Sequence, residues 1–189
     1  MLDTLRLSFA NFASRRAASS RRAERWHRVA CAVAPRFVPS HQALVELLRA
    51  RDARWEAHAV AQEAAERFPE SADAWMLLGD AWQLVFRQQE ALVAYEQALV
   101  FDERPDAALA AGAIYRRSGQ FADAAARFAR AYAAGGGAEA LRQNAEALYQ
   151  AGDDAAADQA LSLWAMQVPD GPARLAQLRA DLRAARRTS

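Results

Sequence analysis

Small residues and large apolar residues recur along the middle of this chain in a pattern that repeats about every 33 residues. The best-preserved stretch runs from Trp75 to Trp82 and reads W-M-L-L-G-D-A-W. Each period holds two stretches whose apolar residues are three or four positions apart, and polar residues separate the two. This spacing is typical of amphipathic helices, so each period predicts a pair of helices joined by a short turn.

The small residues keep their register from one period to the next. One series, in the first helix of each pair, is Gly79, Gly112 and Ala145. A second series, in the second helix, is Ala57, Ala91, Ala124 and Ala157. A larger side chain at these positions would push the helices apart or force off-rotamer strain. We therefore expect them at close helix contacts, with aromatic residues such as Trp75, Tyr95 and Phe128 filling the wider gaps.

The period divides the chain into repeats and flanking segments. Four full helix pairs are expected, at 38–71, 72–104, 105–137 and 138–171. Residues 1–37 are expected to form a basic N-terminal segment with an amphipathic helix and a degenerate helix pair. Residues 172–189 are expected to form a C-terminal capping helix and a basic tail. Each pair exposes apolar surface until the next one stacks on it, so several must stack for stability.

This pattern resembles the tetratricopeptide repeat, whose consensus places Trp, Leu-Gly and Tyr in the first helix and Ala and Phe in the second. The resemblance covers about residues 38–170 and is most specific over 72–133. It implies an all-α fold: a right-handed superhelical solenoid of antiparallel helix pairs.

Three positions depart from the repeat pattern. Phe86 stands in an inter-helix turn where the family usually has glycine, so we expect an unusual turn and an exposed ring. Trp164 stands where alanine is expected, which indicates that the packing changes near the C-terminal cap. The run Gly135-Gly136-Gly137 precedes the fourth repeat and predicts a hinge there.

The resemblance also implies a function. In the family, partners usually lie in a concave groove lined by the first helix of each pair, so we expect a non-enzymatic adaptor or scaffold that holds a partner peptide or helix. Carried onto this chain, the groove comprises Gln42, Glu46, Arg49, Asp73, Met76, Asp80, Gln83, Asp106, Leu109, Arg116, Arg117, Glu139, Arg142, Glu146 and Tyr149.

The charges along this groove change sign. Its second repeat is acidic, whereas Arg116, Arg117 and Arg142 follow in the third and fourth. Arginine is favoured at interfaces because its planar fork binds carboxylates in a bidentate manner. The alternative interpretation is that these charges only solvate the helix faces.

Charge is also uneven along the whole chain. All 24 basic residues are arginine, which is typical of a GC-rich bacterial genome. Residues 1–37 hold eight arginines and two acidic residues, whereas residues 38–170 hold 11 arginines and 20 acidic residues. A basic end can meet nucleic acid, lipid or an acidic partner. No aromatic stacking set or DNA-reading motif accompanies it, so the sequence does not favour nucleic acid.

The N-terminal segment carries its own apolar stripe. Leu2, Leu5, Phe9 and Phe12 recur at three- and four-residue steps, which predicts one apolar face on a helix. This face could dock on the first repeat as a cap, form a homodimer, or lie at a membrane interface, where a single short stripe binds weakly.

Catalytic chemistry has little support in the sequence. There is no Gly-rich phosphate loop, no G-x-S-x-G and no H-E-x-x-H motif. His27 and Cys31 lie one helical turn apart, but two ligands do not complete a zinc site. We expect no catalytic residue, no metal and no cofactor.

The compartment follows from what the chain lacks. Cys31 is the single cysteine and there is no run of 18 apolar residues, so we expect a cytoplasmic protein without a transmembrane segment, or one held peripherally at the inner membrane in a larger complex.

Two narrower functions stay open alongside the scaffold. Residues 105–160 are similar to cytosolic chaperones of type III secretion systems, which are small tandem-repeat proteins. An assembly factor tethered to a membrane or nucleic acid by the basic N-terminus is the other alternative.

Overall fold

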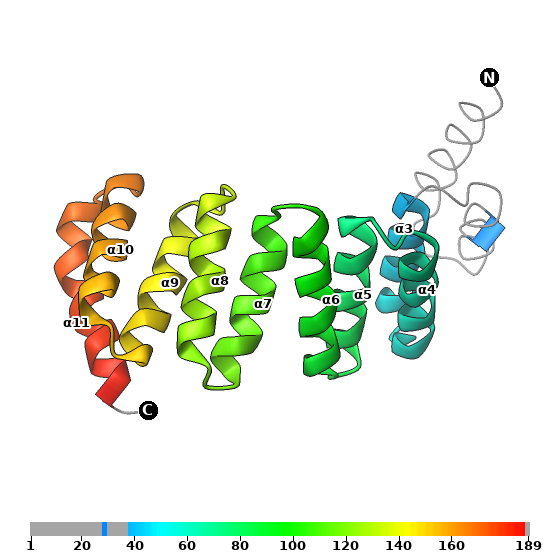
Figure 1. The fold of residues 1–189 in the computed structure, drawn as a ribbon, viewed down its shortest axis with the longest axis horizontal. Coiled ribbons are helices and arrows are strands. Elements are labelled where there is room, and N and C mark those ends of the chain that lie inside the picture. The colour runs from blue at the N-terminus through cyan, green and yellow to red at the C-terminus, as the bar shows by residue number, and fades with distance from the viewer. Residues whose placement is uncertain (1–27, 30–37, 188–189) are drawn as a thin grey trace, which may run out of the picture. The chain divides into compact units, whose positions relative to one another are not determined.

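The computed structural model describes residues 28–29 and 38–187. The chain divides into two compact units, Met1–Phe101 and Asp102–Ser189. In the described part of both units, helices joined by short turns make up the structure (Figure 1).

The first unit contains two helix pairs within its described residues. Helix α3 (Val38–Ala50) packs against α4 (Arg54–Arg67), α4 packs against α5 (Ala72–Leu84), and α5 packs against α6 (Gln88–Phe101). Connections this short make sequential helices antiparallel neighbours. The core between them is built mainly from leucine, valine and alanine side chains of α3, α4 and α5.

The second unit adds two pairs and a final helix. Helices α7 (Pro105–Arg117) and α8 (Phe121–Ala133) form one pair, and α9 (Gly137–Ala151) and α10 (Asp154–Gln167) form the next. Helix α11 (Gly171–Arg187) packs against both α10 and α9.

The predicted all-α fold of antiparallel helix pairs is confirmed over these residues. Each of the four predicted repeats holds one pair, and α11 lies where the sequence predicted a capping helix.

The turn inside each pair uses the same backbone conformation at the same place in the period. Asp52, Phe86, Gly119 and Gly152 have φ angles of 59°, 62°, 74° and 91°. Glycine adopts this left-handed region freely, whereas a bulky residue is strained there. The expected exposure of the Phe86 ring is confirmed, because its side chain is 77% exposed. The expectation of an unusual turn is wrong, because Phe86 adopts the same left-handed conformation as the other three turn residues.

The close contact inside each pair joins a first-helix residue to the residue 16 positions later, and the two volumes compensate each other. A Cβ built on Gly79 would lie 2.5 Å from the Tyr95 ring, and one built on Gly112 would lie 2.7 Å from the Phe128 ring. In the other two repeats the second-helix residue is smaller than an aromatic ring and the first-helix residue is larger than glycine. Those buried pairs are Ala145 with Leu161 and Val45 with Ala61.

The other small residues also lie where the sequence placed them. Ala57, Ala91, Ala124 and Ala157 are all fully buried. The tryptophans Trp75 and Trp82 are partly buried and pack against the core of the first unit.

Near the C-terminal end, Trp164 changes the packing as expected. Its side chain is buried beside Leu141 and Ala165, and the half-buried Leu175 and Leu178 of α11 pack against this cluster. The bulky indole thus provides the apolar surface on which the last helix lies.

The three glycines before α9 form a tight turn. Gly135 and Gly137 have φ angles of 93° and 64°, and a Cβ on Gly136 would lie 2.7 Å from the Ala131 carbonyl oxygen. The turn therefore requires glycine for its geometry, and the hinge stays a prediction.

Candidate functional site

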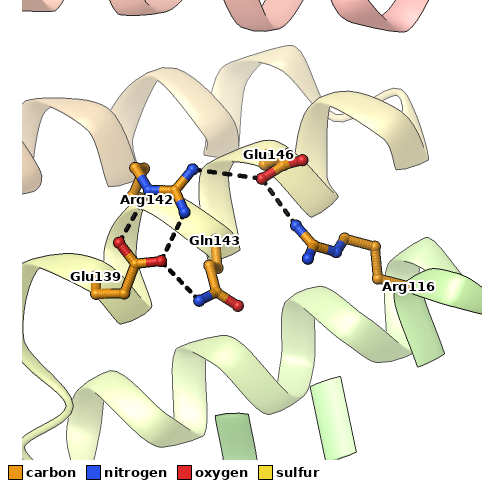
Figure 2. A network of polar contacts seen from close by, with 5 residues as sticks. All are labelled: Arg116, Glu139, Arg142, Gln143 and Glu146. Carbon is orange, nitrogen blue, oxygen red and sulfur yellow. Dashed lines mark hydrogen bonds and ion pairs between the residues drawn. The ribbon is translucent and has the colours of Figure 1, made fainter. Parts of the chain in front are cut away.

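Four of the predicted groove residues meet in one polar network in the second unit (Figure 2). Glu139, Arg142 and Glu146 follow each other at three- and four-residue steps on α9, so they share one face of that helix. Arg116 reaches this face from the last turn of α7.

The first half of the network is a bidentate ion pair on α9. Arg142 donates to Glu139 through Nε at 2.9 Å and through a terminal nitrogen at 2.6 Å. Gln143 donates to the same carboxylate at 2.7 Å. The hydrogen bonds from Arg142 hold the pKa of Glu139 below its usual value, and the pKa of Arg142 is raised in turn. Both groups therefore stay charged near neutral pH.

The second half joins the two helices. A carboxylate oxygen of Glu146 lies 2.9 Å from a terminal nitrogen of Arg116 and 3.6 Å from one of Arg142. The Arg116 guanidinium also lies 5.9 Å from the centre of the Phe128 ring, which limits the directions it can take. Glu146 is thus shared between two arginines on neighbouring first helices.

Two positive and two negative side chains balance in this network, and about a third or more of each remains exposed to solvent. Guanidinium groups have more donors than these two carboxylates occupy. The arrangement can therefore accept a further carboxylate or carbonyl oxygen without leaving a buried charge unpaired.

In the first unit two of the predicted groove residues of α5, Asp80 and Gln83, form hydrogen bonds with a buried core residue. The hydroxyl of the fully buried Tyr95 donates to Asp80 at 2.6 Å, and Gln83 donates to that hydroxyl at 2.6 Å. Each side chain thus has a structural partner, which sequence reasoning did not find because Tyr95 lies on the second helix of the pair.

The remaining groove residues of the first unit are less closely connected. Gln42 and Met76 are half-buried, and Asp73 is exposed in the first turn of α5. Glu46 and Arg49 form an exposed ion pair at 3.5 Å along α3. Exposed pairs of this kind contribute little to stability.

On α7 the predicted residues divide by depth. Leu109 is half-buried against the Ala124–Phe128 cluster, whereas Arg117 is exposed in the last turn. Asp106 is bound by Arg104 at 3.1 and 2.9 Å. Burial raises the pKa of Asp106. The hydrogen bonds from Arg104 and from the Ala107 amide together lower this pKa by more than burial raises it, so the net shift is downward.

The prediction that Tyr149 lines an accessible groove is wrong. Its side chain is 1% exposed, and its hydroxyl donates to Asp158 of α10. Asp158 also lies 2.7 Å from Arg179 and 2.8 Å from Arg183 of α11. Tyr149 is four residues after Ala145, on the close-packed side of α9, and that spacing was the signal for its burial.

Two predicted features lie outside the described residues: the docking face of Leu2, Leu5, Phe9 and Phe12, and the pair His27 and Cys31. Within the described part, no group of three or more His, Cys, Asp or Glu side chains is arranged to hold a metal ion. The same part contains no helix with the length and apolarity needed to cross a membrane.

Stacked antiparallel helix pairs with a small-to-aromatic contact and a left-handed turn inside each pair are typical of the fold of tetratricopeptide-repeat proteins. The chain has this fold, and the prediction made from its sequence is confirmed.

Comparison with solved structures agrees with this assignment. The chain is similar to two crystal structures of MamA. The first has a TM-score of 0.70 and 17% sequence identity, and the match covers 88% of this chain and 91% of that one. The second has a TM-score of 0.65 and 18% sequence identity, and the match covers 77% of this chain and 86% of that one. It is also similar to YrrB, a TPR protein with an unusual peptide-binding site, with a TM-score of 0.64 and 17% identity over 96% and 88%. No family model and no curated protein matches the sequence.

Proposed function

We propose that this chain is a non-enzymatic scaffold that holds a segment of a partner protein on the face formed by α7 and α9. The observation that carries the proposal is the network of Arg116, Glu139, Arg142 and Glu146. These side chains come from two successive first helices, remain accessible, and hold their forks in fixed directions. The peptide-binding site of YrrB, a protein of the same fold, supports the proposal.

The partner segment carries acidic side chains or free backbone carbonyls. Either group would accept hydrogen bonds from the N–H donors of Arg116 and Arg142 that the network does not use, and the nearby Arg117 adds positive charge. Glu139 and Glu146 keep the two guanidinium groups oriented, so little side-chain entropy is lost when a partner binds.

The chemistry of the titratable groups supports a binding role over catalysis. The carboxylate of Glu139 has a lowered pKa and that of Asp106 is lowered as well, so neither is set up as a proton donor near neutral pH. His58 is packed against Trp82 with ring centres 3.8 Å apart, and burial lowers its pKa. A secretion chaperone or a tethered assembly factor is a narrower form of the same role, and each stays a prediction.

An affinity pull-down from the source organism tests the proposal. The bait is the full chain, compared with a variant in which Arg116, Arg117 and Arg142 are all changed to Glu. We expect at least one partner to be lost. The matched control changes Arg51, Arg67 and Arg174 to Glu, which reverses as much charge away from α7 and α9. An unchanged partner list in the first variant would overturn the proposed face.

A charge-swapped variant separates binding from folding. Exchanging the pair to Glu139→Arg with Arg142→Glu keeps an ion pair at the i,i+3 spacing while moving the positive fork along the helix. We expect a small decrease in melting temperature, because the variant also loses the Arg142–Glu146 ion pair and places two carboxylates four residues apart, together with loss of the partner.

A further inference from the structure

The second unit has a hollow on the side of α9 that faces away from the network. The hollow has a volume of about 620 Å³ and lies between the second helices α8 and α10, with α9 beside it. Sites that enclose ligand groups usually have volumes of about 300–1,000 Å³. Its lining includes Ala122, Ala125 and Ala129 of α8, Leu141 and Leu148 of α9, and Leu163 of α10.

This surface is separate from the proposed binding face. Leu141, Asn144 and Leu148 line the hollow, and they follow each other at three- and four-residue steps on α9. At about 3.6 residues per turn, this stripe lies on the opposite side of the helix from Arg142 and Glu146. A partner could therefore occupy one side without displacing a partner on the other.

The repeat register identifies what fills the same place in the first unit. Aligning Ala124 with Ala57 sets Ala122 against Trp55 and Ala125 against His58. Aligning Ala145 with Gly79 sets Leu148 against Trp82. Three small or medium side chains of the second unit thus correspond to two indoles and an imidazole.

In the first unit these aromatic residues pack together. The His58 ring lies 3.8 Å from the Trp82 ring, and the Trp55 ring meets His58 edge-on at 6.2 Å. The buried His58 and the partly buried Trp82 therefore occupy the surface between α4 and α5, whereas the Trp55 side chain is 63% exposed. In the second unit alanines stand at the positions of Trp55 and His58, and Tyr132 is the aromatic residue in the lining of the hollow.

A polar group distinguishes the two places as well. Asn144 lines the hollow and is 8% exposed, and its amide nitrogen donates to the Ala125 carbonyl oxygen at 2.7 Å. This orientation leaves the amide oxygen to accept a hydrogen bond from a group in the hollow. The register sets Asn144 against Leu78, an apolar residue, in the first unit.

We propose that this hollow binds a tryptophan side chain presented by an amphipathic helix of a partner protein. The indole matches the His58 and Trp82 rings that pack together at the corresponding place in the first unit, and its N–H can donate to the Asn144 oxygen. Asp153, exposed at the start of α10, lines the hollow and favours a basic residue beside the anchor.

The test uses the full chain and a fluorescein-labelled amphipathic peptide that carries one tryptophan flanked by lysines. Matched peptides have leucine or alanine in place of the tryptophan. We expect fluorescence anisotropy to show binding of the tryptophan peptide at least about tenfold tighter than the alanine peptide. Equal affinities, or no binding of the tryptophan peptide at about 1 mM, would overturn the proposal.

A filled variant shows whether binding occurs in the hollow. The double substitution Ala122→Trp with Ala125→His places the residues of the first unit in the second. We expect the affinity for the tryptophan peptide to fall at least about tenfold, with a lower melting temperature because Ala125 is 4% exposed and its replacement overpacks the core. The control Ala155→Trp, at an exposed position outside the lining, should bind as before. Unchanged binding by a folded filled variant would contradict the assignment.

Asn144→Leu isolates the hydrogen bond. We expect it to lower the affinity for the tryptophan peptide about fivefold and to leave the affinity for the leucine peptide unchanged. A variant that weakens both peptides equally would contradict the role given to the indole N–H. The Arg116, Arg117 and Arg142 variant should bind the tryptophan peptide normally, so failure here and failure of the proposed scaffold face are distinguishable.

Discussion

At the scale of single residues, Phe86 is a side chain in a backbone conformation that suits glycine. Its φ of 62° is strained for a bulky residue, and its ring is largely exposed, with the Arg54 guanidinium 5.6 Å from the ring centre. We expect Phe86→Gly to raise the free energy of unfolding by about 0.5–1 kcal/mol, because relief of strain exceeds the lost cation–π contact. Urea denaturation measures the change.

The neighbouring position provides the control for Phe86. Arg87→Gly changes an exposed residue whose φ is not positive, so it should lower the free energy of unfolding. If Phe86→Gly is destabilising as well, the contact with Arg54 outweighs the backbone strain.

Gly79 permits the close approach of Tyr95, so Gly79→Ala should be destabilising. The added Cβ would lie 2.5 Å from a ring that is fully buried and held through its hydroxyl. We expect a loss of about 1–3 kcal/mol in the free energy of unfolding, after an offset of about 1 kcal/mol from helix propensity. Combining it with Tyr95→Leu reproduces the pair found at Ala145 and Leu161. The double variant should therefore lose less free energy of unfolding than the two single variants together. If the two losses simply add, the steric coupling between positions 79 and 95 is contradicted.

The sequence predicted these single residues unevenly. The buried small residues and the exposed Phe86 ring could be predicted, because both follow from register and backbone geometry. The bonds from Tyr95 to Asp80 and Gln83 could not, since they depend on how two helices meet in space. The error at Tyr149 is different, because its burial could have been predicted from the four-residue spacing to Ala145, whereas its bond to Asp158 could not.

At the scale of helices, the ion pair on α9 gives part of the second unit a pH dependence. The folded pKa of Glu139 lies below its usual value of about 4.5. Its stabilisation is therefore present above the unfolded pKa and is lost as the pH falls through the folded pKa. We expect Glu139→Gln to lower the free energy of unfolding by less than about 1 kcal/mol at pH 7, because the carboxylate is half exposed.

The pH profile of this difference is the measurement. The stabilities of Glu139→Gln and the parent chain should converge as the pH falls below the usual range of a glutamate. Glu46→Gln, which removes the carboxylate of a looser exposed pair, serves as the reference for loss of one charge. A difference for Glu139→Gln that persists unchanged at acid pH would show that the ion pair does not cause it.

Helix α11 covers apolar surface that would otherwise meet water. Leu175, Leu178 and Leu182 pack against the clusters that contain Leu161 and Trp164. Deletion of residues 172–189 should lower the free energy of unfolding by about 2–4 kcal/mol, since three half-buried leucines are lost. Thermal denaturation and binding of an apolar dye would report it. Truncation after residue 184 keeps all three leucines and should have little effect.

At the scale of the whole molecule, the uneven charge can be tested through the basic N-terminal segment. If residues 1–28 act as a cap, their deletion should lower the melting temperature without changing weak binding to anionic vesicles. If they tether the chain, the full chain should bind such vesicles with an affinity that falls steeply with salt, and the deletion should abolish it. We expect the first outcome, because a single short apolar stripe anchors poorly.

The sequence predicted four repeats over 38–171, and the structure groups their helices into two compact units that divide after Phe101. The period reports which residues meet inside a helix pair, and this local rule holds in all four repeats. It carries no information about where an array divides. The sequence predicted the residues of the candidate network as charged positions on first helices. It did not predict which of these side chains form ion pairs with one another.

The matched volumes inside the pairs have a consequence for how such a chain can change. Tyr95 needs a glycine opposite it, whereas Ala61 leaves room for Val45. A recombination that joined the first helix of the first repeat to the second helix of the second would therefore bring two large residues together, Val45 and Tyr95, and the reverse exchange would bring together two small ones, Gly79 and Ala61. Exchange of complete pairs avoids both defects, so duplication and shuffling should conserve the pair as the heritable unit.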